Sequence, residues 1–444
     1  MTFQIRLDRR VRRMHGGRLL LGGAPMRLVR LSPAGAERLD AWLAGVPVGS
    51  DPAECALARR LLDADLAYPV STGGGLTTDD VTVVVPVKDN SQGLARLLTA
   101  VSDVPRRIVV DDGSAVPIAK SDIRHDVPRG PAAARNAGWR RADTAVVAFL
   151  DSDTIPDDRW LESLLPLFDA PSVAAVAPRI RSLRTGRFGR YDVESSSLDM
   201  GPDPALVRPV GRVRYVPSAA LLVRRVALES VGGFDEDLRF GEDVDLVWRL
   251  ADTGFSVRYQ PSSVVRHEPR HKLGEWLRQR FDYGTSAAAL AVRHGERLRC
   301  AQLSRAHSAV ALLALIGHPI VATMGGVAAA ARATHRLRSL DIPVGVAATT
   351  VTAGHVGVLF QVADALRRVW WLPALASRRR WAILAAAFLP PIAGGLRRGR
   401  GPVWLMMRIA DDLAYGSGVW AGCLRHGVVE PLLPRIAPPR GVSR

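Results

Sequence analysis

Three apolar segments in the first half of the chain each have an acidic residue at their end or within two residues of it. Residues 81–87 read VTVVVPV, residues 107–114 read RIVVDDGS, and residues 144–153 read TAVVAFLDSD. Short, nearly all-apolar runs rich in β-branched residues are typical of strands buried on both faces of a parallel sheet. Helices are expected between them at residues 91–100 and 130–142. This β-α-β-α-β order predicts an α/β fold with a mostly parallel sheet flanked by helices.

Polar residues follow each predicted strand, at the end where ligands bind in open α/β sheets. They are Asp89, then Asp111 and Asp112, then Asp151 and Asp153. Asp151 and Asp153 would share one face if the strand continued past Leu150. Neighbouring carboxylates repel, and a hard divalent cation commonly offsets that repulsion. A plain turn is the alternative, because Asp and Ser often occur in turns.

A further acidic cluster stands in residues 231–250, VGGFDEDLRFGEDVDLVWRL. Glu242, Asp243 and Asp245 are expected to open a helix there. Acidic residues in a first helical turn are favoured by the helix dipole, which is a purely structural explanation. Their occurrence in the same domain as several acidic strand ends favours a functional site instead.

Taken together, six segments in fixed order resemble the family 2 glycosyltransferases of the GT-A fold, over residues 81–250. The segments are VVVPVKDN, VVDDGS, GPAAARNAG, FLDSDT, VPSAALLVRR and GGFDEDLRFGEDVDLVWRL. The resemblance implies an inverting, metal-dependent enzyme that uses a UDP-sugar donor with Mn²⁺ or Mg²⁺. In such chemistry a cation stabilises the departing diphosphate, and a carboxylate takes the proton of the acceptor hydroxyl.

The resemblance also implies roles for individual residues. Contacts with the nucleotide-sugar are expected from Pro86, Asp89, Asp112, Arg135 and Asp151. The metal is expected on Asp153, with His267 as a further ligand; a surface histidine that ends a strand is the alternative for His267. Asp243 is expected to be the general base, and Glu242 and Phe234 are expected on the acceptor side.

Two regions of different character flank the predicted catalytic domain at residues 79–270. Residues 1–78 predict a small α+β unit, with two short strands and two helices, similar to winged peptide-recognition domains; a structural cap is the alternative. Residues 271–444 predict a helical region rich in Ala, Val, Leu, Gly and Arg. Its uncharged stretches 306–331 and 342–363 are long enough to span a bilayer. Helices that lie in the membrane surface, and a soluble helical bundle, remain open.

The net charge and the cysteine content limit the classes of binding partner and site that the chain can have. The formal net charge of +17 suits an anionic membrane or a phosphorylated ligand, and no basic–aromatic pattern points to nucleic acid. Three widely spaced cysteines give no disulfide scaffold or zinc cluster. Because no secretory signal opens the sequence, we expect the catalytic domain at the cytoplasmic face of the cell membrane.

Within the family, the three-part arrangement resembles a group of enzymes that act on a peptide-derived redox cofactor precursor. That narrower resemblance implies transfer of glucose from UDP-glucose and a short β-1,4-linked oligosaccharide. One alternative is a cell-envelope enzyme that adds rhamnose, galactofuranose or glucose to a lipid-linked or polysaccharide acceptor. Another is a non-catalytic binding protein, which the complete set of Asp112, Asp153 and Asp243 disfavours.

Overall fold

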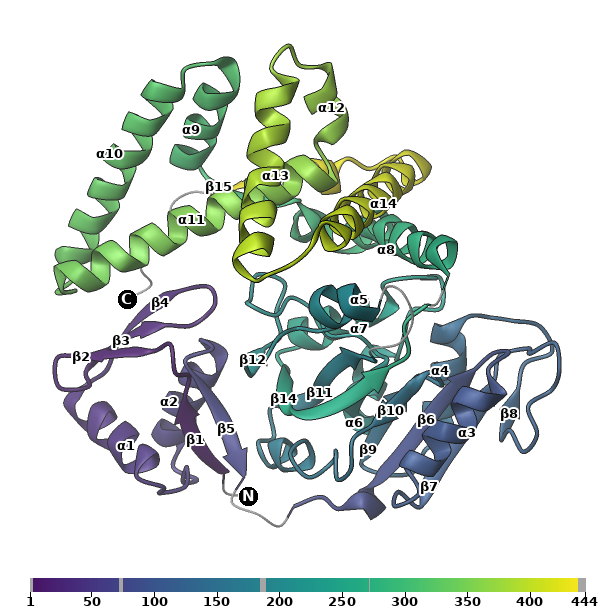
Figure 1. The fold of residues 1–444 in the computed structure, drawn as a ribbon. Helices are drawn as coiled ribbons and strands as arrows, with labels where there is room; N and C mark the ends of the chain where they lie inside the picture. The colour runs from purple at the N-terminus through teal and green to yellow at the C-terminus, as the bar shows by residue number, and fades with distance from the viewer. Residues whose placement is uncertain (1–2, 72–74, 184–188, 271, 438–444) are drawn as a thin grey trace. The chain divides into compact units, whose positions relative to one another are not determined.

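The computed structural model describes residues 3–71, 75–183, 189–270 and 272–437 (Figure 1). The chain divides into two compact units, with the boundary between His271 and Lys272. The predicted N-terminal unit and the predicted catalytic domain both fall in the first of these units. The three-domain division itself stays a prediction.

A nine-stranded mixed sheet forms the centre of the first unit, in the order β10-β14-β11-β13-β9-β6-β7-β8, with β12 paired to β14. Its strands are β6 (Val81–Val87), β7 (Arg106–Asp111), β8 (Ile123–Arg124), β9 (Val146–Leu150), β10 (Thr154–Pro156), β11 (Val173–Ser182), β12 (Ala205–Leu206), β13 (Ala220–Arg224) and β14 (Ser256–His267). The three strands predicted from the apolar segments are confirmed as β6, β7 and β9, and both β7 and β9 pair parallel to β6.

The other half of the sheet is mixed, so the prediction of a mostly parallel sheet holds there only for β11, which pairs parallel with β14. β13 runs antiparallel to both β9 and β11, and β10 and β12 run antiparallel to β14. β9 and β11 end on the same side of the sheet, and β13 starts on that side and runs in the opposite direction. The chain therefore does not cross to the other ends of the strands before β13 begins. The local pattern of apolar residues carries no information about this direction.

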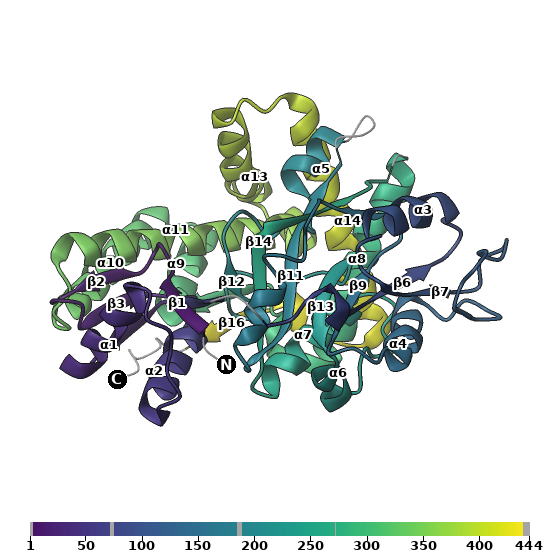
Figure 2. The same ribbon diagram turned by 90° about the horizontal axis from the view of Figure 1, so that it is seen from below.

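Helices cover both faces of the sheet. In the first unit they are α3 (Ser91–Ala100), α4 (Pro131–Arg141), α5 (Gly189–Ser195), α6 (Arg225–Val231) and α7 (Glu242–Asp252), with 3₁₀ turns η1 (Thr78–Asp80) and η2 (Leu165–Asp169). Figure 2 shows α3 and α4 on opposite sides of β6. Successive side chains of β6 point to opposite faces of the sheet, and Val83 and Val85 share a core cluster with Leu97 of α3 on one face. A Cβ on Gly138 of α4 would lie 2.3 Å from Val84, so glycine permits the close approach on the other face.

The N-terminal part of the first unit has its own small sheets and core. β1 (Phe3–Leu7) pairs with β5 (Ala67–Ser71), and β2 (Arg12–Met14), β3 (Leu19–Gly22) and β4 (Arg27–Arg30) form a three-stranded antiparallel sheet. The two helices are α1 (Pro33–Leu43) and α2 (Pro52–Asp63). Ser32 caps α1 by accepting a hydrogen bond from the N–H of Gly35, at 3.1 Å. The two predicted strands are confirmed as β3 and β4, and the two predicted helices as α1 and α2. The second helix was predicted to continue through Leu66, but α2 ends at Asp63 and residues 67–71 form β5. The likeness to winged domains stays a prediction.

Polar contacts join this N-terminal part to the large sheet. The buried guanidinium of Arg258, on β14, donates to the carbonyl of Leu62 at 3.2 Å. The buried carboxylate of Asp65 accepts a hydrogen bond from the N–H of Leu206 at 2.9 Å. Burial lowers the pKa of Arg258 to about 10, although the carboxylates of Asp65 and Asp63 oppose that shift.

The second unit is helical, as predicted. Its elements are α8 (Leu273–His294), α9 (Arg305–Ile316), α10 (Pro319–Arg338), α11 (Val344–Arg368), α12 (Trp371–Ala376), α13 (Arg380–Arg397) and α14 (Pro402–His426), the 3₁₀ turns η3 (Gly295–Leu298) and η4 (Glu430–Leu432), and the parallel pair β15 (Ala301–Ser304) and β16 (Pro434–Ala437).

The uncharged stretch 306–331 is not one continuous helix. It is divided between α9 and α10, with Gly317 at a φ of 100° and Pro319 in the first turn of α10. Within the described residues, α11 alone is long and apolar enough to cross a bilayer. Membrane association stays a prediction at this point.

Candidate functional site

The Asp-Ser-Asp sequence forms a turn and does not extend the strand. β9 ends at Leu150, and the N–H and hydroxyl of Thr154 both donate to the carbonyl of Asp151, at 3.0 and 2.7 Å. The expectation that Asp151 and Asp153 share a strand face is therefore wrong. Instead Asp151 contacts Arg135, whereas Asp153 contacts His267.

Asp153 and His267 come together because β10 pairs with the end of β14. Thr154 is the register partner of His267, and the carboxylate Oδ2 of Asp153 lies 3.5 Å from Nε2 of the imidazole. Burial raises the pKa of Asp153, but His267, Arg270 and a backbone hydrogen bond together lower it overall. For His267, burial lowers the pKa, and the carboxylates of Asp153 and Asp151 together raise it overall.

This pair fits a divalent cation only in part. A carboxylate oxygen and an imidazole nitrogen are both ligands that Mn²⁺ accepts. No group of three or more His, Cys, Asp and Glu side chains suited to a metal occurs among the described residues. The pair therefore supplies two possible ligands for a cation, and the remaining ligands would have to come from other groups.

Arg135 connects the turn after β9 to the start of α7. From α4, its Nη2 donates to Asp151 at 2.6 Å and its Nη1 donates to Glu242 at 2.8 Å. The guanidinium also stacks on Phe234, 5.5 Å from the ring centroid. Its side chain is 4% exposed, and although burial lowers the pKa of Arg135, Asp151 and Glu242 raise it further. Arg135 was predicted to contact the nucleotide, but the polar contacts seen here are with other residues of the protein. The contact with the nucleotide stays a prediction.

Glu242 and Asp243 begin α7, as predicted. The carboxylate of Asp243 accepts hydrogen bonds from the N–H groups of Val244, at 2.7 Å, and Ser218, at 3.3 Å. Burial raises the pKa of Asp243 in spite of these bonds. Burial, followed by the charge of Asp243, raises the pKa of Glu242 to about 7, against the opposing effect of Arg135. Both groups thus bind protons more readily than ordinary carboxylates, and proton acceptance is what a general base requires.

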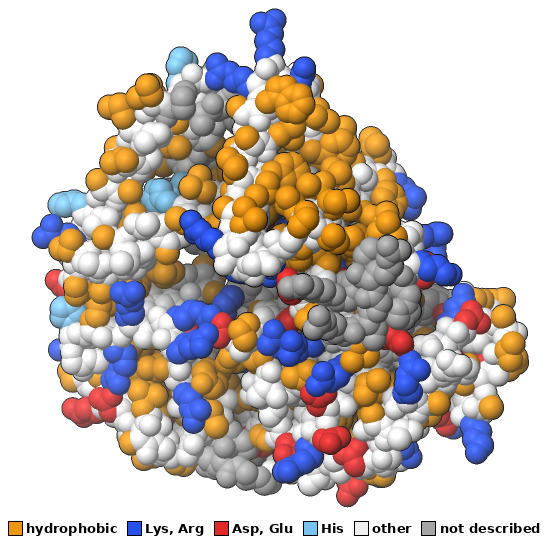
Figure 3. All heavy atoms as spheres, in the orientation of Figure 1, with side chains coloured by type: hydrophobic (Ala, Val, Ile, Leu, Met, Phe, Trp, Pro, Cys, Tyr) orange, Lys and Arg blue, Asp and Glu red, His pale blue; other side chains and the backbone are white. Residues whose placement is uncertain are grey.

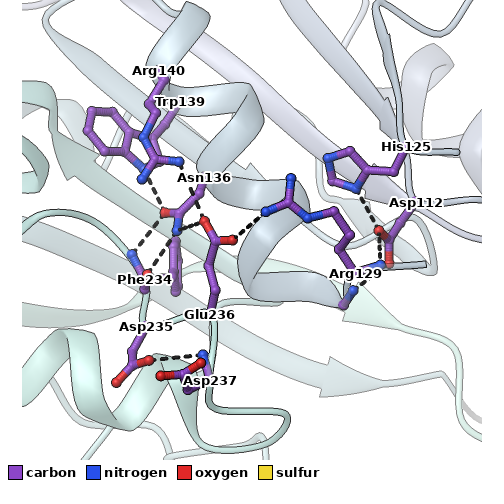
Figure 4. A network of polar contacts seen from close by, with 11 residues as sticks. Asp112, His125, Arg129, Asn136, Trp139, Arg140, Phe234, Asp235, Glu236 and Asp237 are labelled. Atoms are coloured by element: carbon purple, nitrogen blue, oxygen red, sulfur yellow. Dashed lines mark hydrogen bonds and ion pairs between the residues drawn. The ribbon is translucent and has the colours of Figure 1, made fainter. Parts of the chain in front are cut away.

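Asp112 is buried and fully hydrogen-bonded within the protein (Figure 4). Its carboxylate accepts from the N–H groups of Arg129 and Gly130, both at 2.8 Å, and lies 2.7 Å from Nδ1 of His125. Asp89 is held similarly, since its carboxylate accepts from the N–H of Ala115 at 2.8 Å. Pro86 lies in β6, one residue before the end of the strand.

Some residues of this region were missed by sequence reasoning. Asn136 exchanges two hydrogen bonds with the backbone of Phe234 and also donates to Glu236, at 2.8 Å (Figure 4). Glu236 in turn accepts from Arg129, at 2.9 Å. Asn136 and Glu236 stand inside the quoted motifs, but a motif does not reveal that they pair with each other. His125, beside Asp112, belongs to no motif at all.

Two linked groups of side chains therefore lie near the carboxyl ends of the parallel strands. Asp151, Arg135, Glu242 and Asp243 form one, and Asp153 with His267 forms the other. Such an arrangement places possible cation ligands at the same end of the sheet as two carboxylates of raised pKa, Glu242 and Asp243.

Comparisons with known proteins identify the family. Residues 82–230 match the family model described as glycosyl transferase family 2. The chain is 41% identical to pre-mycofactocin glycosyltransferase of Mycobacterium tuberculosis, over 98% of this chain and 98% of that protein. It is 26% identical to glycosyltransferase AglE of Haloferax volcanii, over 46% of this chain and 71% of that protein.

Among solved structures, the mannosyltransferase PcManGT from Pyrobaculum calidifontis, in complex with GDP-Man and Mn²⁺, aligns with a TM-score of 0.42 and 19% identity, over 78% of this chain and 87% of that one. The family match confirms the resemblance seen in the sequence motifs and accords with the GT-A-like fold. Similarity to pre-mycofactocin glycosyltransferase extends this agreement to the flanking regions. The chain belongs to family 2 of the glycosyltransferases.

Proposed function

We propose that this glycosyltransferase transfers glucose from UDP-glucose to the mycofactocin precursor, a peptide-derived redox cofactor precursor. The product is a short β-1,4-linked oligosaccharide, made at the cytoplasmic face of the cell membrane. The observation that carries the proposal is the 41% identity to pre-mycofactocin glycosyltransferase, because it covers 98% of both chains. Similarity confined to the catalytic domain would support only the reaction class, since a fold does not fix the acceptor.

The partly buried carboxylate of Asp243 supports its proposed role as the general base. An acceptor hydroxyl has a high pKa and needs a nearby group to take its proton as it attacks the sugar. Burial raises the pKa of Asp243 and makes its carboxylate a better proton acceptor. Attack in line with the departing diphosphate inverts the anomeric carbon, so an α-linked donor gives a β-linked product.

The proposal assigns the donor to the other side of the site. Asp153 and His267 would hold Mn²⁺ or Mg²⁺, which when bound neutralises charge that develops on the leaving diphosphate. Pro86, Asp89, Asp112, Arg135 and Asp151 would surround the nucleotide and ribose. The N-terminal unit predicted at residues 1–78 would take part in recognising the peptide-derived acceptor.

The test measures UDP release from UDP-glucose, other UDP-sugars and dTDP-sugars, with Mn²⁺ or with EDTA. Each reaction is run with and without the mycofactocin precursor, and the Asp243→Asn variant is the inactive control. Release from UDP-glucose that needs both the metal and the precursor is the expected result.

Two other outcomes would overturn parts of the proposal. Metal-dependent UDP release that is the same with and without the precursor would indicate a different acceptor. The enzyme would then be one that adds rhamnose, galactofuranose or glucose to a lipid-linked or polysaccharide acceptor of the cell envelope. No release from any donor, by folded protein that binds the precursor, would favour a non-catalytic role.

A further inference from the structure

Helix α13 presents a wholly apolar face to solvent. The exposed positions between its terminal arginines are Trp381, Ala382, Ala385, Ala386, Leu389, Ala393 and Leu396. At 3.6 residues per turn they fall on one side of the helix. Trp381 is 74% exposed, Leu389 60% and Leu396 68%. Figure 3 shows hydrophobic side chains gathered over α12 and α13. We name these seven residues the apolar face of α13.

Arginines bound this face at both ends. Arg378, Arg379 and Arg380 precede it, and Arg397, Arg398 and Arg400 follow it. No Asp or Glu stands between Asp364 and Asp411, so nothing in this stretch balances the positive charge. Tryptophan at an apolar boundary, as at Trp381, is typical of the membrane–water interface. The apolar face and its flanking arginines together complement a partner with an apolar interior and anionic groups at its surface.

The opposite side of α13 is fixed to the protein by a buried charged group. Pro391 has no N–H, so the carbonyl of Ala387 lacks its usual helical donor. Arg367 supplies the missing donor from Nη1, at 2.6 Å. Arg367 also donates to Asp412, at 2.9 Å, and both side chains are buried. The inner side of α13 is therefore unavailable to lipid.

The exposed side contains a second interruption. Pro390 cannot donate to the carbonyl of Ala386, which belongs to the apolar face. A backbone carbonyl without a helical donor is costly in the hydrocarbon core, where no water reaches it, but not among hydrated headgroups. This argues for a helix that lies along the surface of a bilayer and against one that crosses it.

We propose that the apolar face of α13 binds the surface of a bilayer that contains anionic phospholipids. The apolar side chains enter the interfacial region, and the arginines at both ends contact lipid phosphates. A second copy of the chain is a less suitable partner, because two such faces would bring like charges together. This surface is independent of the glycosyltransferase site, and its test needs no donor or acceptor.

The experiment is co-sedimentation of the full chain with vesicles of phosphatidylcholine alone or mixed with phosphatidylglycerol. The test variant is Leu389→Asp with Leu396→Asp, two exposed positions that the folded core does not use. The matched control is Leu424→Asp, a leucine of the same unit that is 80% exposed and lies outside the apolar face. A second variant changes Arg378, Arg379 and Arg380 to Gln.

Wild type and the Leu424→Asp control are expected to bind the anionic vesicles, more weakly as salt is raised, and to bind neutral vesicles poorly. The double aspartate variant is expected to bind roughly tenfold or more weakly, and the glutamine variant to lose most of the salt dependence.

Equal binding by the double aspartate variant and wild type would overturn the proposal, as would equal binding to neutral and anionic vesicles. A wild-type dimer that the double aspartate variant abolishes, without vesicle binding, would assign the face to a second copy instead.

Discussion

Arg135 donates a hydrogen bond to Glu242 at 2.8 Å, across 107 residues of sequence. The same guanidinium holds Asp151, so the turn after β9 and the first turn of α7 share one buried cation. The proposed metal side and the proposed base side of the site are thereby held in a fixed relation.

Replacing Arg135 by Met is expected to destabilise the first unit by roughly 3–5 kcal/mol, because two carboxylates lose their buried partner. The measurement is denaturant unfolding of the full chain. Arg140→Met is the control, since Arg140 is half-exposed and pairs with Glu236 at the surface. A loss no larger than that of the control would contradict the bridging role of Arg135.

Glu242→Gln is expected to change how stability depends on pH. The pKa of Glu242 is about 7 in the folded protein, against an ordinary value of 4.5, so the folded protein holds the extra proton between these values. The free energy of unfolding of the wild type should therefore fall, relative to the variant, as the pH rises through that interval. Thermal unfolding at a series of pH values measures this, with exposed Glu229→Gln as the control. Parallel profiles for wild type and Glu242→Gln would rule the effect out.

Asp153→Asn is expected to weaken Mn²⁺-dependent UDP binding by at least roughly tenfold, because a carboxylate ligand is lost. Titration calorimetry with Mn²⁺ and with EDTA measures it. Asp157→Asn removes a nearby acid whose pairing with Arg266 is at the surface, and should bind as wild type does. Unchanged metal-dependent affinity in Asp153→Asn would remove this residue from the metal site.

Asp243→Asn is expected to keep donor binding while the transfer rate falls about 10²–10⁴-fold, as for loss of a general base. Binding of UDP-glucose and single-turnover transfer, measured on the same preparation, separate the two effects. Exposed Asp237→Asn serves as the control. Near-normal turnover in Asp243→Asn would exclude it as the base.

Local sequence patterns predicted the elements well and their partners poorly. The strand 81–87 and the helix 91–100 have the expected bounds, because apolar runs and the Asn90 cap act over a few residues. The bridge from Arg135 to Glu242 and the antiparallel direction of β13 depend on residues far apart in the chain. The family motifs named candidate site residues, but did not reveal the role of Asn136. The turn at Asp151 was foreseen only as the alternative to a continued strand.

The contacts of Arg258 with the N-terminal part of the chain have a consequence for how the protein is made. Arg258 follows Leu62 by 196 residues, so the carbonyl that it binds is synthesised long before its donor. Because synthesis proceeds from the N-terminus, the segment that contains Leu62 leaves the ribosome before β14 and gains these contacts only after β14 has been added. An unrelated N-terminal segment grafted onto this catalytic sheet would leave the buried guanidinium of Arg258 without an acceptor, unless a backbone carbonyl of the new segment reached the same position.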